Sequence, residues 1–393
     1  MPVLTEFHVK NFKSIRDLRL ELGRVTVLIG ENGSGKSNIL EALALAAAAA
    51  VNKLDHEFLA SRGIRTTEPR FMRSAFEPGN TENIEITTVI DELHWQFTLS
   101  STGEGPYDKW YGKISGDGVP KHPPRAEKIV EDLLDAFLDI GALADAVGAS
   151  DIASPSRSDI QAFMKARAVR RAFGEFLAYS PENTSLRNFE QEGQILPLGV
   201  KGEGLFQLLK TLAADEARMA ELRENLRLID WFEDIRVATD LAPFERRIGI
   251  RDRYLAADDA GLAYFDQRSS NEGFLFLLFY FTLLVSPATP KLFAIDNIDA
   301  SLNPKLCTEL MRRMVALAVK HDKQMLITTH NPAVLDGLDL NDDQQRLYAV
   351  YRNSKGHTKA RRISPPKPIG DEPPIKLSEA FLRGLLGGLP QNF

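Results

Sequence analysis

The stretch VTVLIGENGSGKS, from Val25 to Ser37, decides the fold of this chain. The apolar and β-branched residues Val25 to Ile29 predict a buried strand, and the glycine-rich loop after them follows the pattern GxxxxGKS. The residues from Asn38 to Ala42 then predict a helix. A loop in this position predicts a phosphate-binding site, because glycines let backbone N–H groups close around phosphates at the N-terminus of a helix.

The residue types of this loop predict the ligand more closely. The Lys36 ammonium is expected to reach the β- and γ-phosphates of a nucleotide, and the Ser37 hydroxyl is expected to ligate Mg²⁺. The predicted cofactors are therefore ATP and Mg²⁺, with GTP left open because no pattern for base recognition is readable. The residues expected to bind the nucleotide in this loop are Asn32, Gly33, Ser34, Gly35, Lys36, Ser37 and Asn38.

The bulk composition narrows the class of protein without choosing a function. The chain has 393 residues, 44% hydrophobic and 26% charged, with a formal net charge of −6, which gives no global reason for nucleic-acid affinity. The single cysteine, Cys307, excludes an intrachain disulfide and suits a reducing cytosol. The N-terminus lacks signal-peptide features, and the apolar run 274–285 is too short to span a bilayer. We therefore expect a cytoplasmic protein without a membrane partner.

Hydrophobic periodicity divides the chain into four parts. Residues 1–120 predict the N-terminal part of a nucleotide-binding core, in which Ile84–Ile90 and His94–Leu99 form antiparallel strands around an Asp91-Glu92 turn. Residues 121–230 predict an inserted helical lobe, with helical stretches at 125–147, 158–177 and 204–227. These stretches are too short for a long antiparallel coiled coil.

The C-terminal third returns to the core. Residues 231–363 predict a buried strand ending at Asp296, a helix over 304–320 and a second strand ending at His330, which is a parallel strand-helix-strand pattern. One or two strands are expected between Arg346 and Ile363. Residues 364–393 predict a proline-rich linker and a short helix from about Ser378. Asp296, at the carboxyl end of its strand, is expected to hold Mg²⁺ beside Ser37.

The motifs also occur in the order found in a known family. They are NFKS at Asn11–Ser14, GENGSGKSNILEA at Gly30–Ala42, SSNEG at Ser269–Gly273, IDNIDASLNP at Ile295–Pro304 and TTHNP at Thr328–Pro332. The chain resembles ABC-type ATPases of the RecF, SMC and OLD group, in particular the standalone AAA-type ATP-binding proteins associated with bacterial anti-phage systems. The resemblance covers 1–50 and 265–350, and it implies an α/β fold: an ABC-type P-loop NTPase core, a mixed sheet flanked by helices, with an inserted helical lobe.

The resemblance implies further site residues and a partner. Two identical heads are expected to meet head to tail, so that a homodimer, with a higher oligomer left open, buries nucleotide between its subunits. The residues assigned in this way to nucleotide are Lys13 and, acting on the partner's γ-phosphate, Ser269, Ser270, Asn271 and Gly273. A plain helix cap by Ser270 or Asn271 is the alternative for this segment. Asn303-Pro304 matches the loop that links the two sites, and His330 matches the residue that senses the γ-phosphate.

The residue after Asp296 departs from the family pattern. Family members usually carry glutamate there to polarise the attacking water, whereas the Asn297 amide can hydrogen-bond that water but cannot accept its proton. We therefore expect slow ATP hydrolysis, or ATP used as a binding switch. The catalytic candidates are Asn297, His330 and Asp299, and Asp299 requires the backbone to turn after Asn297. The alternative for Asp299 is a cap for the following helix.

Two functions follow from these expectations. The first is an ATP-gated dimer that scaffolds or regulates a separate effector, a nuclease or toxin of a phage-defence system. The second is a RecF-like DNA-binding ATPase of recombination or repair, which would use basic residues in 346–362 and 165–171. A membrane-transporter ATPase is disfavoured by the Asn11-Phe12-Lys13 opening and the large insertion. No cluster of Asp and Glu with metal-site spacing follows His330, so nuclease chemistry is not expected in this chain.

Overall fold

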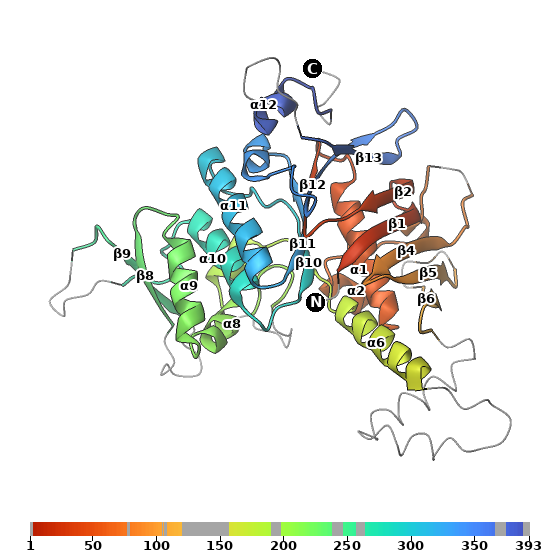
Figure 1. Ribbon diagram of the computed structural model, residues 1–393, viewed down its shortest axis with the longest axis horizontal. Coiled ribbons are helices and arrows are strands. Elements are labelled where there is room, and N and C mark those ends of the chain that lie inside the picture. The colour runs from red at the N-terminus through yellow and green to blue at the C-terminus, as the bar shows by residue number, and fades with distance from the viewer. Residues whose placement is uncertain are drawn as a thin grey trace.

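A six-stranded sheet forms the centre of the molecule (Figure 1). The computed structural model describes residues 3–76, 79–103, 105, 108–119, 157–189, 198–237, 247–256, 264–365 and 375–387. The strand order is β13-β12-β3-β11-β10-β7, in which β13 is antiparallel to β12 and every other neighbouring pair is parallel. The strands are β3 (Val25–Ile29), β7 (Ala178–Tyr179), β10 (Leu292–Ile295), β11 (Gln324–Thr329), β12 (Gln345–Arg352) and β13 (Thr358–Ile363).

The parallel strands bring the predicted motifs to one edge of this sheet. Ile29, the last residue of β3, pairs with Thr329, the last residue of β11, and β10 ends beside them at Ile295. The glycine-rich loop and the residues after β10 and β11 therefore leave the sheet side by side. The carboxyl edge of a parallel sheet is where open α/β folds bind their ligands.

A second sheet covers one face of the central sheet and encloses a helix. Its order is β2-β1-β4-β5-β6, and its strands are β1 (Leu4–Phe12), β2 (Ile15–Glu21), β4 (Ile84–Ile90), β5 (Leu93–Ser101) and β6 (Trp110–Gly116). Helix α1 (Lys36–Ala50) belongs to the same core as side chains from both sheets. The alanine run 46–50 is buried in that core, and its small side chains let the helix lie close to the strands.

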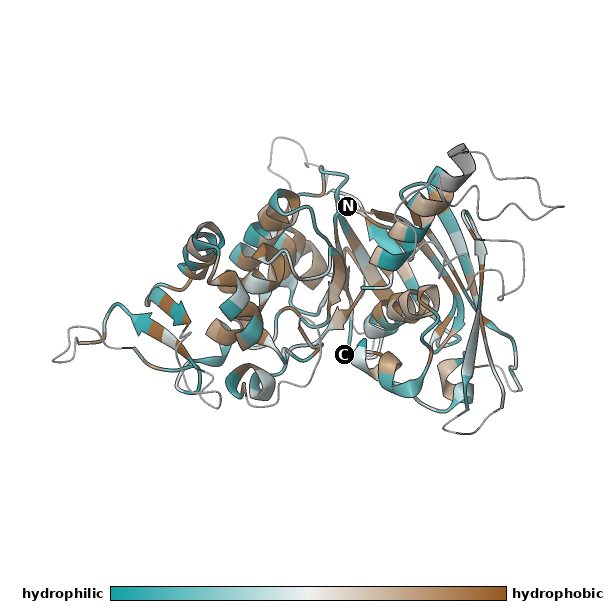
Figure 2. Cartoon of the chain, turned by 90° about the horizontal axis from the view of Figure 1, so that it is seen from below, coloured by the Kyte–Doolittle hydropathy of each residue, from teal (hydrophilic) through white to brown (hydrophobic). Residues whose placement is uncertain are grey.

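Helices cover the opposite face of the central sheet (Figures 1 and 2). They are α8 (Leu205–Leu212), α9 (Glu216–Leu226), α10 (Glu272–Val285) and α11 (Pro304–Lys320). In α10 every residue from Phe274 to Val285 is buried, as expected for a helix that is hydrophobic all round. The apolar run 274–285 therefore forms a buried helix.

The described part of residues 121–230 is divided between the two faces of the central sheet. Helix α6 (Arg157–Phe173) packs on the side of α1, whereas α8 and α9 lie on the opposite face with the short α7 (Asn183–Arg187). Strand β7 of the same stretch pairs with β10 at one edge of the central sheet. The predicted helix at 204–227 is two helices, because the chain turns at 213–215. The predicted helix at 125–147 lies outside the described residues, and the four domain boundaries stay predictions.

The remaining elements complete the core at its margins. The predicted turn between β4 and β5 is confirmed, with Asp91 and Glu92 both in the left-handed region at φ 50° and 69°. The sequence did not predict the hairpin β8 (Phe232–Val237) and β9 (Ile248–Asp252). The other short elements are α2 (His56–Ser61), α3 (Pro69–Met72), η1 (Pro332–Gly337) and α12 (Leu377–Leu382). Among the described helices, none combines the length and apolar character needed to cross a bilayer.

Candidate nucleotide-binding site

The glycine-rich loop runs from the end of β3 to the first turn of α1. Gly33 and Gly35 have φ angles of 77° and 105°, a region that glycine enters without steric cost. Gly35 also needs to lack a Cβ, because that atom would lie 2.0 Å from Thr358 Oγ1. Asn32 and Gly33 are exposed at the tip of the loop, whereas Ser34 is buried.

Lys36 is held by the loop itself. Its Nζ donates to the carbonyl oxygens of Gly30 at 2.7 Å and Glu31 at 2.9 Å, and the residue is 6% exposed. Burial lowers the pKa of Lys36 below the usual lysine value, and the negative charges of Asp296 and Asp299 oppose that effect. The ammonium is therefore held inside the loop, and its contact with a phosphate stays a prediction.

The two predicted Mg²⁺ ligands are in direct contact. Ser37 Oγ donates to Asp296 Oδ2 at 2.8 Å, and the Thr328 hydroxyl donates to the other oxygen of the same carboxylate. Mg²⁺ typically takes one or two protein oxygens and completes its shell with water and phosphate, so this pair fits the ion. Within the described residues, no group of three or more His, Cys, Asp and Glu gathers as a different metal site.

Asn297 and Asp299 follow Asp296 through a tight turn. Asn297 is exposed and has a left-handed φ of 54°, and its N–H donates to Thr328 Oγ1 at 2.9 Å. The turn brings Asp299 back to the site, where Thr329 Oγ1 donates to its Oδ1 at 2.6 Å and His330 Nε2 lies 3.4 Å from its Oδ2. The Asp299 side chain is 7% exposed, whereas that of His330 is 49% exposed.

The alternative of Asp299 as a helix cap is wrong. Asn303 caps α11, because its side chain accepts from Leu306 N at 3.0 Å, and Pro304 follows in the first turn. The Asp299 carboxylate is committed instead to Thr329 and His330. A buried carboxylate paired with a histidine is a group that can orient or deprotonate a water molecule.

The segment Ser269–Gly273 begins α10, on the face of the central sheet opposite α1. Asn271 is the helix cap, with its Oδ1 accepting from Phe274 N at 2.8 Å. The Ser269 hydroxyl donates to Asp266. Ser270 is buried, and its Oγ has no hydrogen-bond partner among the residues that the structure describes. These contacts hold the segment against its own helix, so the alternative of a cap by Asn271 is confirmed, and a trans contact with nucleotide stays a prediction.

Lys13 lies at the far end of the site, near the start of α1. Its ammonium pairs with Glu41 of α1 and donates to the carbonyl of Arg65 at 2.9 Å. Burial lowers the pKa of Lys13, and the Glu41 charge opposes that effect. Arg65 pairs with the same carboxylate and donates to Asn38 Oδ1 at 3.1 Å. Sequence reasoning missed Arg65 and Glu41, although Glu41 stands inside the quoted motif.

The hairpin β12–β13 lies against the outside of the glycine-rich loop. Arg352 Nε donates to the carbonyl of Gly33 at 2.8 Å, and Thr358 Oγ1 donates to that of Ser34 at 2.8 Å. The ring of Phe76 lies 5.5 Å from the Arg352 guanidinium. Sequence reasoning grouped Arg352 with basic residues and gave Thr358 no role, because neither belongs to a local motif.

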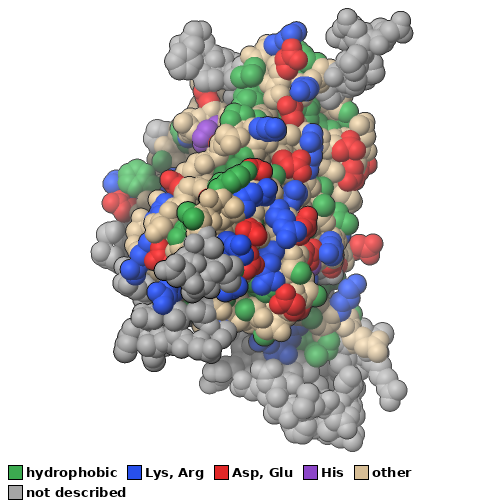
Figure 3. Space-filling model, turned by 90° about the vertical axis from the view of Figure 1, so that its left-hand side faces the viewer, with side chains coloured by type: hydrophobic (Ala, Val, Ile, Leu, Met, Phe, Trp, Pro, Cys, Tyr) green, Lys and Arg blue, Asp and Glu red, His purple; other side chains and the backbone are tan. Residues whose placement is uncertain are grey.

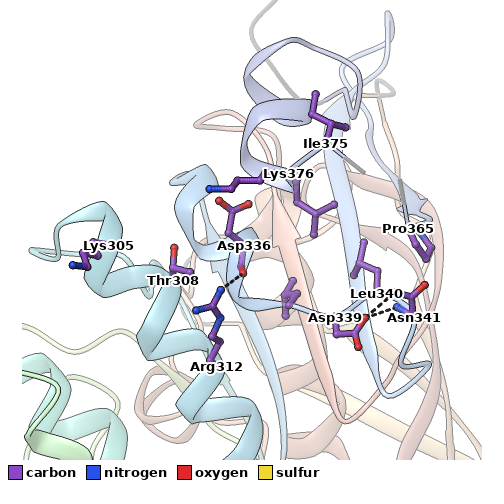
Figure 4. A pocket seen from close by; sticks show the side chains of 12 residues that line it. Lys305, Thr308, Arg312, Asp336, Asp339, Leu340, Asn341, Pro365, Ile375 and Lys376 are labelled. Carbon is purple, nitrogen blue, oxygen red and sulfur yellow. Dashed lines mark hydrogen bonds between the residues drawn. The ribbon is translucent and has the colours of Figure 1, made fainter. Parts of the chain in front are cut away.

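A separate pocket lies between α11, η1 and α12 (Figure 4). Its volume is about 430 Å³, and it is bordered by the cations Lys305, Arg312 and Lys376 and by the carboxylates of Asp336 and Asp339. Asp336 also accepts a hydrogen bond from the first turn of α12, since Ser378 N donates to its Oδ1 at 2.9 Å. The glycine-rich loop does not border this pocket, so it is distinct from the nucleotide site.

Two family models match the chain. One, described as an AAA domain, matches residues 6–234, which include the glycine-rich loop. The other, described as "AAA domain, putative AbiEii toxin, Type IV TA system", matches residues 207–336, which include Asp296 and His330. Together the two matches cover both halves of the site.

Solved structures show the fold. An SMC head bound to the C-winged helix domain of ScpA aligns with a TM-score of 0.55 at 14% identity, over 92% of this chain and 98% of that one. An SMC head from Pyrococcus furiosus with an extended coiled coil, bound to the C-terminal domain of ScpA, aligns with a TM-score of 0.52 at 14% identity, over 93% and 97%. The predicted ABC-type P-loop ATPase fold is confirmed by these alignments.

One curated relative matches a short segment. An uncharacterized protein of Methanocaldococcus jannaschii is 50% identical over 44 residues, which are 11% of this chain and 20% of that protein. The match thus spans about a fifth of the relative's length.

Proposed function

This chain belongs to the AAA domain family of ATPases, and from that premise we propose that it binds ATP with Mg²⁺, hydrolyses the nucleotide slowly and uses it to control a dimer. The observation that carries the proposal is the 2.8 Å contact between Ser37 and Asp296, which lie 259 positions apart in the chain. The fold joins a hydroxyl at a helix N-terminus to a carboxylate beside a buried lysine. Ser37 and Asp296 would hold Mg²⁺ there, and the ion would supply positive charge that neutralises the phosphates.

The residues of the site have separate roles in this proposal. The phosphates are bound by the loop N–H groups from Asn32 to Asn38 and by the Lys36 ammonium. The Mg²⁺ ion is held by Ser37 and Asp296. Asn297 donates or accepts a hydrogen bond from the attacking water. Asp299 accepts a proton from that water or holds the His330 ring in position, because its carboxylate lies 3.4 Å from His330 Nε2.

Asp299→Asn is expected to lower steady-state ATP turnover about tenfold or more, because the amide keeps a hydrogen bond with Thr329 but loses the basic carboxylate beside His330. Phosphate release at saturating MgATP measures the effect. A matched control is Asp17→Asn, which removes a carboxylate 2.9 Å from His8 on β1, outside the site. Equal turnover in wild type and Asp299→Asn contradicts the role given to Asp299.

The dimer is proposed on the N-terminus of α10. Asn271 caps this helix of 14 residues, so the helix presents a positive partial charge at Ser269–Gly273. The segment belongs to the face of the sheet opposite α1. In a head-to-tail pair, the positive end of α10 would stabilise the negative charge of a γ-phosphate bound by the second copy.

Asn271→Asp is expected to abolish ATP-dependent dimers while leaving the monomer folded. Asp caps a helix as well as Asn does, but its charge repels phosphate. Sedimentation or native mass measurement with and without MgATP gives the readout. Mixing this variant with Lys36→Ala should restore dimers that hold one intact composite site. No restoration in the mixture, with both variants folded, contradicts sharing of the site between subunits.

The effector and its role in anti-phage defence extend this proposal. A dimer that ATP stabilises in one geometry changes the affinity of any partner bound to that geometry. The second family description names a toxin system, and the solved SMC heads are bound to a separate protein, ScpA. A nuclease or toxin is the proposed partner here, and co-purification with the products of neighbouring genes tests it.

DNA binding in the manner of RecF is the alternative. Lys165 and Arg171 are exposed on α6, which favours a phosphate contact there. The basic residues of the β12–β13 hairpin mostly have partners within the protein. Arg346 and Arg362, for example, both pair with Glu21. On the face that includes α9 and β8–β9, Lys and Arg alternate with Asp and Glu (Figure 3). Salt-sensitive binding of duplex DNA by the purified chain is the observation that would favour this alternative.

A further inference from the structure

Four hydrogen bonds connect five side-chain or backbone groups next to the glycine-rich loop. Arg65 Nη2 donates to Asn38 Oδ1 at 3.1 Å, and Asn38 Nδ2 donates to Ser14 Oγ at 2.7 Å. The Ser14 and Thr358 hydroxyl oxygens are 2.7 Å apart, and Thr358 Oγ1 donates to the Ser34 carbonyl at 2.8 Å. The groups come from the α2–α3 segment, α1, the β1–β2 turn, β13 and the loop.

The protons of this relay have one consistent direction. The Thr358 hydroxyl has a single proton, which goes to the Ser34 carbonyl because that carbonyl can only accept. Ser14 must therefore donate to Thr358, which leaves the Ser14 oxygen to accept from Asn38. Arg65 can only donate, so it fixes the amide oxygen of Asn38 on its own side. Each group in the relay is thereby satisfied in one orientation.

Burial makes the relay hard to replace with water. Thr358 and Ser34 are 0% exposed and Ser14 is 3% exposed. A Cβ on Gly35 would lie 2.0 Å from Thr358 Oγ1 and 2.9 Å from Ser14 Oγ, so both hydroxyls press directly on the loop backbone. Thr358 N also donates to the Ser14 carbonyl at 2.8 Å, which holds the two segments together.

The relay fixes the direction of a loop N–H group. In a trans peptide the C=O and N–H bonds point to opposite sides. Because the Ser34 carbonyl is bonded to Thr358, the N–H of Gly35 in the same peptide plane points away from the hairpin. An N–H on that side is available to a phosphate oxygen, whereas a flipped peptide would present a carbonyl and repel it.

We propose that Thr358 is a positioning residue, which holds the loop in its phosphate-binding shape through the Ser14–Asn38 relay. The inference rests on the proposed nucleotide site and adds to it a residue from the far end of the sequence. Thr358 acts through the Ser34–Gly35 peptide and needs no contact with the nucleotide.

Thr358→Val is expected to raise the dissociation constant for MgATP about tenfold, because Val has the same shape but leaves the Ser34 carbonyl and the Ser14 proton unpaired. Thr358→Ser keeps the hydroxyl and should stay within about threefold of wild type. The matched control is Thr26→Val, which removes a buried hydroxyl that accepts from Gly23 N at 3.1 Å at the other end of β3. Titration calorimetry gives affinity, and thermal unfolding without nucleotide gives stability.

A double-mutant cycle separates a relay from independent packing. Ser14→Ala breaks the same relay at its middle. The relay therefore predicts that the double variant loses far less affinity for MgATP than the sum of the losses in the two single variants. Additive losses, or a Thr358→Val variant that binds like wild type, overturn the proposal. An equal loss of affinity in Thr26→Val also overturns it, since that loss would be purely structural. If Thr358→Val does not fold, Ser14→Ala against wild type decides alone. Failure of wild type to bind MgATP would instead remove the proposed function.

Discussion

Replacing Lys36 with alanine is expected to raise the dissociation constant for MgATP by about 100-fold or more. Lys36 is 6% exposed and its ammonium donates to two loop carbonyls, so the charge is already at the loop before phosphate binds. Without it, Asp296 and Asp299 leave net negative charge where the γ-phosphate must bind. The loss of affinity therefore has two causes, which are the missing charge-assisted hydrogen bond from Lys36 to phosphate and this repulsion.

Titration calorimetry at fixed Mg²⁺ measures the effect, and circular dichroism confirms that the variant is folded. Lys291→Ala is the matched control, because Lys291 Nζ likewise donates to a backbone carbonyl, that of His321 at 2.8 Å, at the opposite end of β10. The control is expected to bind MgATP as tightly as wild type. A Lys36→Ala protein that binds with unchanged affinity would place the nucleotide elsewhere on the chain.

Sequence reasoning found those parts of the site that carry their chemistry in a local pattern. A buried strand followed by glycines, lysine and serine predicted the loop, and an apolar strand ending in a carboxylate predicted Asp296. In the structure Ser37 of this loop donates a hydrogen bond of 2.8 Å to Asp296. The parallel sheet explains this success, because strands of that kind end together at one edge.

The residues that sequence reasoning missed reach the site through tertiary contacts alone. Thr358 lies in the stretch from Arg346 to Ile363, where the sequence predicts only one or two strands, and Arg65 lies in a segment without a readable period. Strand β7 is two residues long, too short for periodicity to identify, although it extends the central sheet. The sequence also grouped 121–230 as one lobe, whereas the described part of this stretch lies on both faces of the sheet. Only tertiary contacts show which face each helix covers.

The turn after Asp296 shows how one residue type affects both conformation and chemistry. Asn297 has a φ of 54°, a left-handed conformation that asparagine adopts more readily than most residues. The same turn returns Asp299 to Thr329 and His330. Asparagine at this position therefore favours the turn and at the same time supplies an amide, which cannot accept a proton from water.

Asn297→Glu is expected to raise the rate of ATP hydrolysis about 100-fold, because general-base catalysis typically contributes that much or more. The glutamate must adopt the left-handed backbone, at a cost of about 1 kcal/mol. The chain already holds Glu92 at a φ of 69°, so the conformation is accessible to this residue type. Single-turnover phosphate release at saturating MgATP isolates hydrolysis from nucleotide exchange.

Asn297→Gln is the matched control for that experiment, since it has the length of glutamate without a basic oxygen. If position 297 faces the attacking water, only the glutamate variant accelerates hydrolysis, and the acceleration falls at low pH as the new carboxylate is protonated. A glutamate variant no faster than wild type, or a glutamine variant equally fast, would mean that residue 297 does not reach that water. The proton would then have to be taken by Asp299, whose carboxylate lies 3.4 Å from His330.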